Sequence, residues 1–360
     1  MCRPEAKDLG RATASTRMMA PVPTAWSGAA SNEVAMDVTA QILGLLALLI
    51  LRGKVLSGSR ALAGAAMLVA LLASAGCVKK IAINKIGDAL ASGGATFSSD
   101  DDPELIRQAV PFSLKLMESF LAESPKHRGL LLAACKGFTE YTYAFVQQDA
   151  DEAEGRNLEA AKVLRVRARH LYLRARDYGL RGLDARHPGF AKSLRDDPRA
   201  AVKRIRSAKE LPLVYWTAAS WGLAISTSKD NPELIADQPI VEALIDRTLE
   251  IDEGFENGAA HAFLINYEPN RPGGKGDPLE RSRKHFERAV ELSHGELAAP
   301  FVAMAETVSV QKQDRAEFKS LLERALAIDP DAKPEWRLEN MVMQRRARWL
   351  LARGDELFVE

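Results

Sequence analysis

The sequence is poor in the features that define several large classes of protein. Its 360 residues include only three cysteines, at positions 2, 77 and 135, and none of them form a C-x-x-C pair. This excludes a disulfide framework and the common cysteine-based zinc and redox motifs. Aromatic residues make up 6% of the chain, and 49 basic against 48 acidic residues give a formal net charge of +1. The general basic character of a nucleic-acid-binding protein is therefore absent, and we expect no nucleic-acid partner.

Recognisable catalytic and metal-binding motifs are also missing. The six histidines show neither H-E-x-x-H nor a His-x-Glu with paired cysteines, so the sequence predicts no zinc site. No G-x-S-x-G nucleophile elbow occurs, and the Gly-rich stretch 271–276 lacks the spacing of a phosphate-binding loop. We therefore expect no enzymatic activity, no cofactor and no metal ion, and we interpret 271–276 as a turn-forming loop.

Two apolar runs occupy the N-terminal region. The second, at 61–76, follows a short basic stretch and ends at Cys77, in the order typical of a signal peptide. A run of this length is short for a helix that must cross roughly 30 Å of hydrocarbon. The last four residues, 74–77 (SAGC), resemble the lipobox of bacterial lipoproteins, although serine stands where leucine is usual. The resemblance implies cleavage before Cys77 and its acylation. An ordinary signal peptide or an uncleaved anchor is the alternative.

These patterns divide the chain into four segments. We expect a disordered leader at 1–54, upstream of a later true start of translation, and a lipoprotein signal peptide at 55–76. A lipidated N-terminus and tether at 77–102 then leads to a helical domain at 103–358. Acyl chains such as palmitate on Cys77 would hold the protein on the periplasmic face of the outer or inner membrane.

Apolar residues recur with the 3.6-residue period of amphipathic helices from position 103 onward. No segment shows the sustained alternation typical of strands, and Pro, Gly, Asn and Asp lie between the periodic segments. We therefore predict an all-α chain of helical hairpins. The expected helices cover 103–123, 127–148, 153–184, 199–208, 211–228, 233–252 with a break near Pro239, 256–267, 278–292, 296–313, 315–328 and 334–353.

Two segments of the C-terminal half repeat one pattern of small and large residues. The strings at 285–293 (HFERAVELS) and 321–329 (LLERALAID) place Ala289 and Ala325 at equivalent positions 36 residues apart. A third and weaker copy lies at 244–252. Small residues at such positions let helical hairpins stack closely, as in tetratricopeptide repeats. The sequence therefore predicts a tetratricopeptide-like stack of hairpins, which is an α-solenoid.

Three stretches of the helical domain are distinctive: the apolar aromatic helix 211–226, the helix, loop and repeat helix at 255–293, and the terminal helix at 334–358. In this order they resemble the T-component family of TRAP (tripartite ATP-independent periplasmic) transporters, over roughly 85–358. The resemblance implies a non-enzymatic lipoprotein of cryptic tetratricopeptide units with a hydrophobic channel through each protomer. It also implies a homotrimer that binds the substrate-binding protein of the transporter.

The helix at 211–228 carries no charge between Glu210 and Lys229, so it must be buried nearly all round or line an apolar cavity. Trp216 and Trp221 are about 140° apart on that helix, so they cannot share one face. One of them can face a channel while the other packs, and the alternative is that both fill the core. The candidate channel residues are Tyr215, Trp216, Trp221, Phe263 and Tyr267.

Basic residues supply the candidate partner contacts. Arg167, Arg174 and Arg181 recur every seven residues and predict a positive ridge along one helix. Arg271 and Lys275 lie in the Pro- and Gly-rich loop, where exposed polar groups often carry function. We expect these five residues to contact an acidic partner or anionic head groups, and a solvated surface balanced by nearby acidic residues is the alternative.

These observations predict a periplasmic accessory component. It would bind the TRAP substrate-binding protein and pass a hydrophobic organic acid through an apolar channel. The alternative is a tetratricopeptide scaffold lipoprotein for envelope or outer-membrane assembly, with a groove for extended peptide and no channel.

Overall fold

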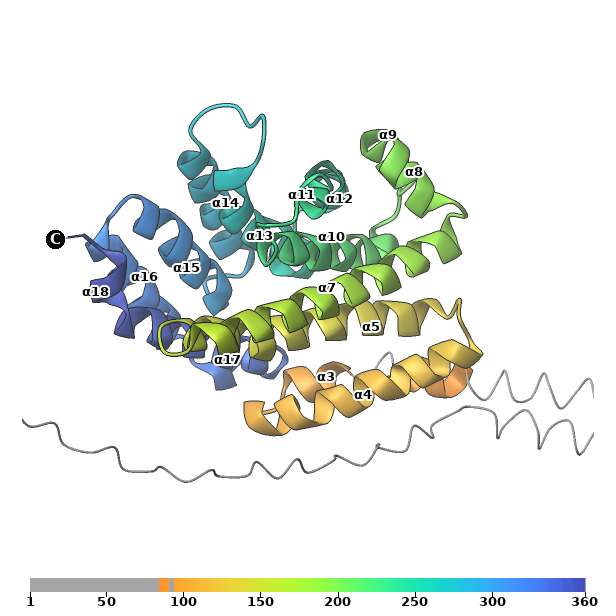
Figure 1. Cartoon of the computed structure of the whole chain (residues 1–360), viewed down its shortest axis with the longest axis horizontal. Helices are drawn as coiled ribbons and strands as arrows, with labels where there is room; N and C mark the ends of the chain where they lie inside the picture. Colours follow the sequence, from red (N-terminus) through yellow and green to blue (C-terminus); the bar gives the residue numbers. More distant parts are fainter. Residues whose placement is uncertain (1–83, 91–93, 360) are drawn as a thin grey trace, which may run out of the picture. The chain divides into compact units, whose positions relative to one another are not determined.

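The computed structural model describes residues 84–90 and 94–359, and every regular element in these ranges is a helix (Figure 1). The all-α prediction is confirmed for this part of the chain. The expected leader, the signal peptide and Cys77 lie outside the described residues. None of the described helices is both long and apolar enough to cross a membrane.

A short helical segment at 84–90 precedes the labelled elements. These are α3 (Gly94–Ser98), α4 (Pro103–Glu123), α5 (Arg128–Tyr141), the π-helical η1 (Thr142–Gln147), α6 (Gln148–Glu154), α7 (Leu158–Arg186), α8 (Phe190–Asp196), α9 (Pro198–Val202), η2 (Ala208–Glu210), α10 (Leu211–Ser226), α11 (Pro232–Ile235), α12 (Gln238–Ile251), η3 (Phe255–Asn257), α13 (Ala259–Tyr267), η4 (Glu268–Asn270), α14 (Pro278–Leu292), α15 (Ala298–Met304), the π-helical η5 (Ala305–Ser309), α16 (Arg315–Ala327), η6 (Pro330–Ala332), η7 (Pro334–Trp336), α17 (Arg337–Ala352) and α18 (Gly354–Leu357).

Helix starts match the expected positions where the capping residues are strong. Asp102 and Asp277 accept hydrogen bonds from backbone N–H groups of the first turns of α4 and α14, and proline follows each of them. An acidic side chain at this position satisfies donors that the helix leaves free, and proline has no donor to lose there. Both helices therefore occur at 103–123 and 278–292, as predicted.

The structure differs from the expected elements in three places. The helix expected at 199–208 ends at Val202, and α8 precedes it in a stretch interpreted as loop, because Asp197 both ends α8 and caps α9. The stretch 77–102 was expected to be a tether, yet it contains the helical segment 84–90 and α3. The expected helices at 127–148 and 296–313 each run into a π-helical turn, η1 and η5, for which the apolar period gives no signal.

The residues of the repeat pattern are buried where the pattern predicts. Ala289 and Ala325 are 1% and 0% exposed, and they belong to one apolar core that α14, α15, α16 and α17 share. A second core forms around α7, α10 and α12, where Gly179 allows a close approach. A Cβ atom on Gly179 would lie 2.1 Å from Oγ1 of Thr217, so only glycine fits between α7 and α10.

The last long helix returns to the beginning of the described domain. Helix α17 contacts α3 and α4, and Arg337 donates a hydrogen bond of 2.8 Å to the carbonyl of Ser99. In a simple solenoid each repeat contacts only its neighbours in the chain. The contact between the two ends is therefore a feature that the repeat pattern does not predict.

Two consecutive arginines fix this return. Arg346 is 7% exposed. Its Nη1 donates hydrogen bonds to Oε1 of Gln148 at 2.8 Å and to Oδ2 of Asp151 at 3.1 Å. Its Nε donates a hydrogen bond to Oε2 of Glu306 at 2.8 Å. One guanidinium thus joins α17 to α6 and η5. Arg345 donates to Asp149 and Glu152 of α6, but 36% of its side chain is exposed.

We expect Arg346→Ala to lower the free energy of unfolding by about 3–5 kcal/mol, because it removes a buried cation and leaves the partly buried carboxylates of Asp151 and Glu306 unpaired. The neighbouring Arg345→Ala should cost less than about 1 kcal/mol, since the Arg345 side chain is itself about one third exposed. Urea unfolding followed by circular dichroism measures both values. Equal losses in the two variants would contradict the importance that we assign to Arg346.

Candidate functional site

Four charged side chains from three distant parts of the chain come together beside α10. Lys136 and Glu140 lie one turn apart on α5, Glu256 lies in η3, and Glu339 lies in the first turn of α17. We name these four residues the central cluster. Its position depends on the return of α17, because Glu339 belongs to that helix.

The ammonium of Lys136 lies between two carboxylates and an aromatic ring. Its Nζ is 3.7 Å from Oε1 of Glu140 and 3.7 Å from Oε1 of Glu256, and it is 5.0 Å from the centre of the Trp216 ring. The indole Nε1 of Trp216 donates to Oε1 of Glu256 at 3.4 Å. The central cluster is therefore contiguous with the aromatic residues at the start of α10.

The carboxyl groups of the central cluster are accessible to solvent and yet surrounded by protein. Half of the Glu140 side chain is exposed, and Glu339 is also exposed. Nevertheless, burial among protein atoms raises the pKa of Glu140 to about 7, with the carboxylate of Glu256 adding to this effect. Burial and Glu256 likewise raise the pKa of Glu339 to about 7.

Burial also disfavours the charged form of Lys136, but the carboxylates of Glu140, Glu256 and Glu339 outweigh it and raise the lysine pKa. The ammonium therefore stays protonated in the neutral range. Three carboxyl groups face one ammonium, and so the cluster becomes more negative as the pH rises through 7.

The five candidate channel residues comprise two aromatic pairs and one fully buried side chain. Tyr215 and Trp216 are beside the central cluster, with ring centres 5.2 Å apart. Phe263 stacks instead on Tyr267 at 5.5 Å, and the Tyr267 hydroxyl donates to Glu242 of α12 at 3.1 Å. Both pairs pack against the same apolar core around α7, α10 and α12.

Trp221 is a core residue. It is 0% exposed, and its indole Nε1 donates to Oδ2 of Asp237 at 3.1 Å. The guanidinium groups of Arg176 and Arg195 lie over the ring at 5.0 and 5.6 Å. Trp221 was a candidate channel residue, and the structure instead places its ring in the apolar core with no exposed surface.

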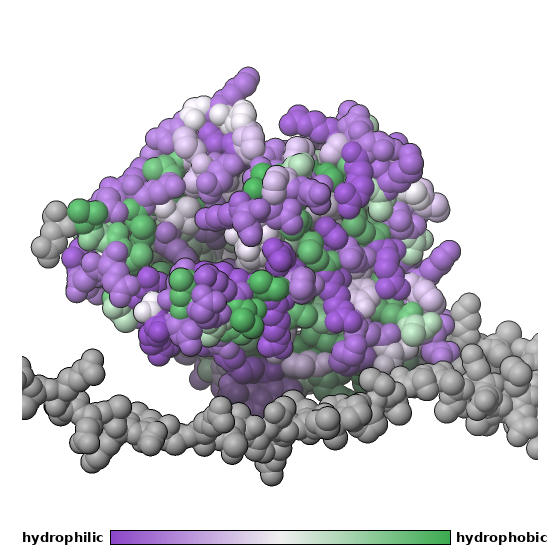
Figure 2. Space-filling view, in the orientation of Figure 1, coloured by the Kyte–Doolittle hydropathy of each residue, from purple (hydrophilic) through white to green (hydrophobic). Residues whose placement is uncertain are grey.

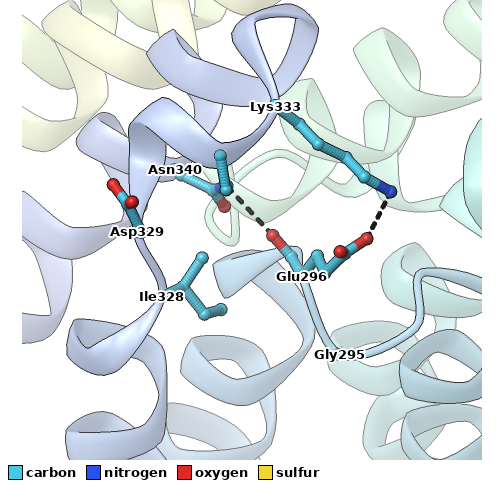
Figure 3. A pocket seen from close by; sticks show the side chains of 7 residues that line it. Gly295, Glu296, Ile328, Asp329, Lys333 and Asn340 are labelled. Atoms are coloured by element: carbon cyan, nitrogen blue, oxygen red, sulfur yellow. Dashed lines mark hydrogen bonds and ion pairs between the residues drawn. The ribbon is translucent and has the colours of Figure 1, made fainter.

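Two small cavities of the described part of the chain lie elsewhere. One of about 190 Å³ is lined by Glu296, Lys333 and Asn340, which turn toward one another rather than toward open space (Figure 3). Asn340 Nδ2 donates to the carbonyl of Glu296 at 3.0 Å, its Oδ1 accepts from the N–H of Ala298, and Lys333 pairs with the Glu296 carboxylate. These polar groups satisfy each other, and we interpret the cavity as structural. The other cavity, of about 290 Å³, is lined in part by Arg346 and Trp349.

Comparison with known proteins identifies the family of this chain. A family model described as TRAP transporter T-component matches residues 99–358. The chain belongs to this family. It is also 27% identical over 267 residues to an uncharacterized protein of Treponema pallidum (strain Nichols), a match that covers 73% of this chain and 83% of that protein. The resemblance in the sequence is thereby confirmed, and it gives the chain an accessory role in TRAP transport.

Only part of the positive ridge expected on this T-component is available to a partner. Arg174 Nε pairs with Glu118 of α4 at 2.6 Å, and Arg181 donates to the carbonyl of Pro125 at 3.2 Å. Both residues therefore hold the C-terminal half of α4 and the following turn against α7. Arg167 is exposed, and within the described part of the chain it has no hydrogen bond or ion pair. Of the three, it is the residue best placed for a partner.

The two loop candidates also differ from each other. Only 17% of the Arg271 side chain is exposed, and its guanidinium pairs with Asp246 at 2.6 Å and with Glu268 at 2.9 Å. The expectation that Arg271 is an exposed contact residue is therefore wrong, because the side chain anchors its own loop. Lys275 is exposed at the tip of that loop.

The sequence did not predict that the four residues of the central cluster lie together. Glu256 and Glu339 lie far from α5 in the chain, and nothing in their local sequence marks them. One signal was available, since Lys136 and Glu140 are the only charges in the otherwise apolar stretch 129–146. A charged pair one turn apart in such a stretch indicates an accessible face within a largely buried helix.

We expect Glu140→Gln and Glu339→Gln to stabilise the T-component at pH 8 but not at pH 4. A glutamate has a pKa of about 4.3 in the unfolded chain. Since the folded value is about 7 for both residues, ionisation penalises the folded state increasingly as pH rises from about 4.3 to 7. The glutamine variants lack this penalty, so we expect their melting temperature to rise by roughly 1–3 °C at pH 8.

Thermal unfolding at pH 4, 6 and 8 measures this difference. Glu287→Gln, at an exposed position on α14, is the matched control and should show no such trend. A gain in stability that is the same at all three pH values would contradict the raised pKa values.

Proposed function

We propose that this T-component is a lipoprotein anchored through Cys77 on a periplasmic membrane face, where it binds the substrate-binding protein of a TRAP transporter. The observation that carries the proposal is the family match, which extends over almost all of the described helices. Cys77 lies seven positions before Asn84, the first residue that the structure describes. Assembly as a homotrimer is part of the same proposal.

We further propose that the ligand passes the surface formed by Tyr215, Trp216 and the central cluster. An aromatic wall suits an apolar ligand such as a hydrophobic organic acid. The carboxyl groups of Glu140, Glu256 and Glu339 would repel an anion when all three are ionised. The raised pKa values of Glu140 and Glu339 support a route that accepts an organic acid more readily as the pH falls below 7.

The contact with the substrate-binding protein would use the exposed Arg167 and Lys275. Within residues 84–90 and 94–359, neither forms an ion pair of the kind that engages Arg174 and Arg271. Much of the visible surface is hydrophilic, with apolar side chains in small separate groups (Figure 2). Attraction between opposite charges is therefore a reasonable basis for association, and it should weaken with salt.

Native mass spectrometry of residues 78–360 with the substrate-binding protein of the same transporter tests the proposal. We expect a trimer that binds the partner, with affinity falling roughly two- to fivefold for each of Arg167→Glu and Lys275→Glu at low salt. Arg199→Glu, the same charge change at an exposed position on α9, should leave the affinity unchanged.

A persistent monomer that never associates with the substrate-binding protein would contradict the adaptor role. Capture of an outer-membrane assembly protein by the same fragment would favour the scaffold function instead.

A further inference from the structure

Helix α4 has an apolar face that no described residue covers. Its inner face packs Leu114, Met117 and Leu121 against α5 and α7. On the opposite face Phe112 is 73% exposed and Leu105 is 54% exposed. Together with the partly exposed Ala109 and Leu116 they recur at i, i+4, i+7 and i+11. We name Leu105, Ala109, Phe112 and Leu116 the outer stripe, since this spacing places them along one line of the helix.

The outer stripe faces away from the rest of the described domain. Helix α4 forms one edge of the fold in Figure 1, with α5 on its inner side. The side chains of Glu104, Gln108 and Lys115 lie beside the stripe and are exposed. An apolar line with charged flanks is typical of a helix that lies in an interface between water and a less polar phase.

The first described residues lie against the C-terminal end of α4. Asn84 is held at the C-terminal end of α4, where the hydroxyl of Ser124 donates to its side-chain oxygen at 3.0 Å. Its carbonyl lies 3.2 Å from Nε2 of His127. Cys77 is seven residues upstream, and seven extended residues span at most about 25 Å. An acyl anchor on Cys77 would therefore keep the C-terminal end of α4 within about 25 Å of the bilayer.

The sequence after Cys77 contributes basic residues, and the helical segment 84–90 contributes an exposed apolar side chain. Lys79, Lys80 and Lys85 follow Cys77 with no acidic residue before Asp88. Ile86, in the helical segment 84–90, is 49% exposed. A lipid chain combined with nearby basic residues is a recurrent way to hold a protein on an anionic membrane surface.

We propose that the outer stripe of α4 lies on the surface of the same membrane leaflet that holds the acyl chains of Cys77. This inference rests on the proposed lipid anchor. The anchor supplies the attachment, and the stripe sets the orientation, so that α4 lies along the membrane and the remaining helices extend away from it. A second copy of the chain is a poorer occupant, since the stripe exposes on the order of 300 Å² of apolar surface and a stable protein interface needs about 800 Å² per partner.

Site-specific fluorescence on the mature acylated protein tests this orientation. The variants Phe112→Cys and Ile235→Cys are labelled with an environment-sensitive dye. Ile235 is the matched apolar control, because it is 36% exposed on α11, which lies on the other side of α5 and α7 from α4 in Figure 1. The native Cys135 does not compete for the dye, since it is 0% exposed and burial raises its thiol pKa to about 12.

Both labelled proteins are bound to vesicles of phosphatidylethanolamine and phosphatidylglycerol that contain nitroxide-labelled lipid. We expect the label at 112 to shift to shorter wavelength and to be quenched severalfold more strongly than the label at 235. Equal, water-like signals from both positions on vesicles that carry the protein would overturn the membrane contact.

Flotation of the vesicles separates this result from a failure of the anchor. Protein that does not float contradicts acylation of Cys77, and the inference about α4 fails with it. Protein that floats while the label at 112 stays in water leaves the anchor intact and overturns the orientation alone. A label at 112 that becomes shielded without vesicles, as protein concentration rises, would show that a second copy occupies the stripe.

Discussion

The arrangement of the described domain depends on one buried guanidinium. Arg346 connects α17 to α6 through Gln148 and Asp151 and to η5 through Glu306. Both neighbours are part of or next to a π-helical turn, where the backbone departs from the regular α-helical spacing. A buried cation is favourable only when such partners surround it. The interaction therefore fixes the path of α17 closely, and with it the return of the C-terminal helix to the first helices.

The candidate site follows from this return. Glu339 belongs to α17, whereas Lys136 and Glu140 belong to α5 and Glu256 to η3. Without α17 in place, Glu140 would lose the carboxylate of Glu339, which adds to the rise in the Glu140 pKa. The stabilising ion pairs around Arg346 thus offset the cost of holding three carboxyl groups close together beside an aromatic wall. Retention of such an unfavourable cluster in a folded domain is common at sites that bind or transfer ligands.

The sequence predicts the fold class and the helices that have strong local signals. The starts of α4 and α14 follow from Asp102 and Asp277, and the burial of Ala289 and Ala325 follows from the repeat. The π-helical turns and the return of α17 could not be predicted, because they depend on contacts such as Arg346 with Asp151, 195 residues apart. The same reason explains the site. Trp216 was a reasonable candidate from its own helix, but its neighbours Lys136 and Glu256 come from other segments.

In the proposed adaptor role, the T-component contacts the substrate-binding protein near Arg167 and Lys275. Hydrogen–deuterium exchange of the mature protein, with and without the substrate-binding protein of its transporter, tests this claim most directly. We expect slower exchange in the complex around the first half of α7 and in the 271–276 loop, with little change in the core helix α12. Unchanged exchange throughout the chain at saturating partner concentration would contradict the account.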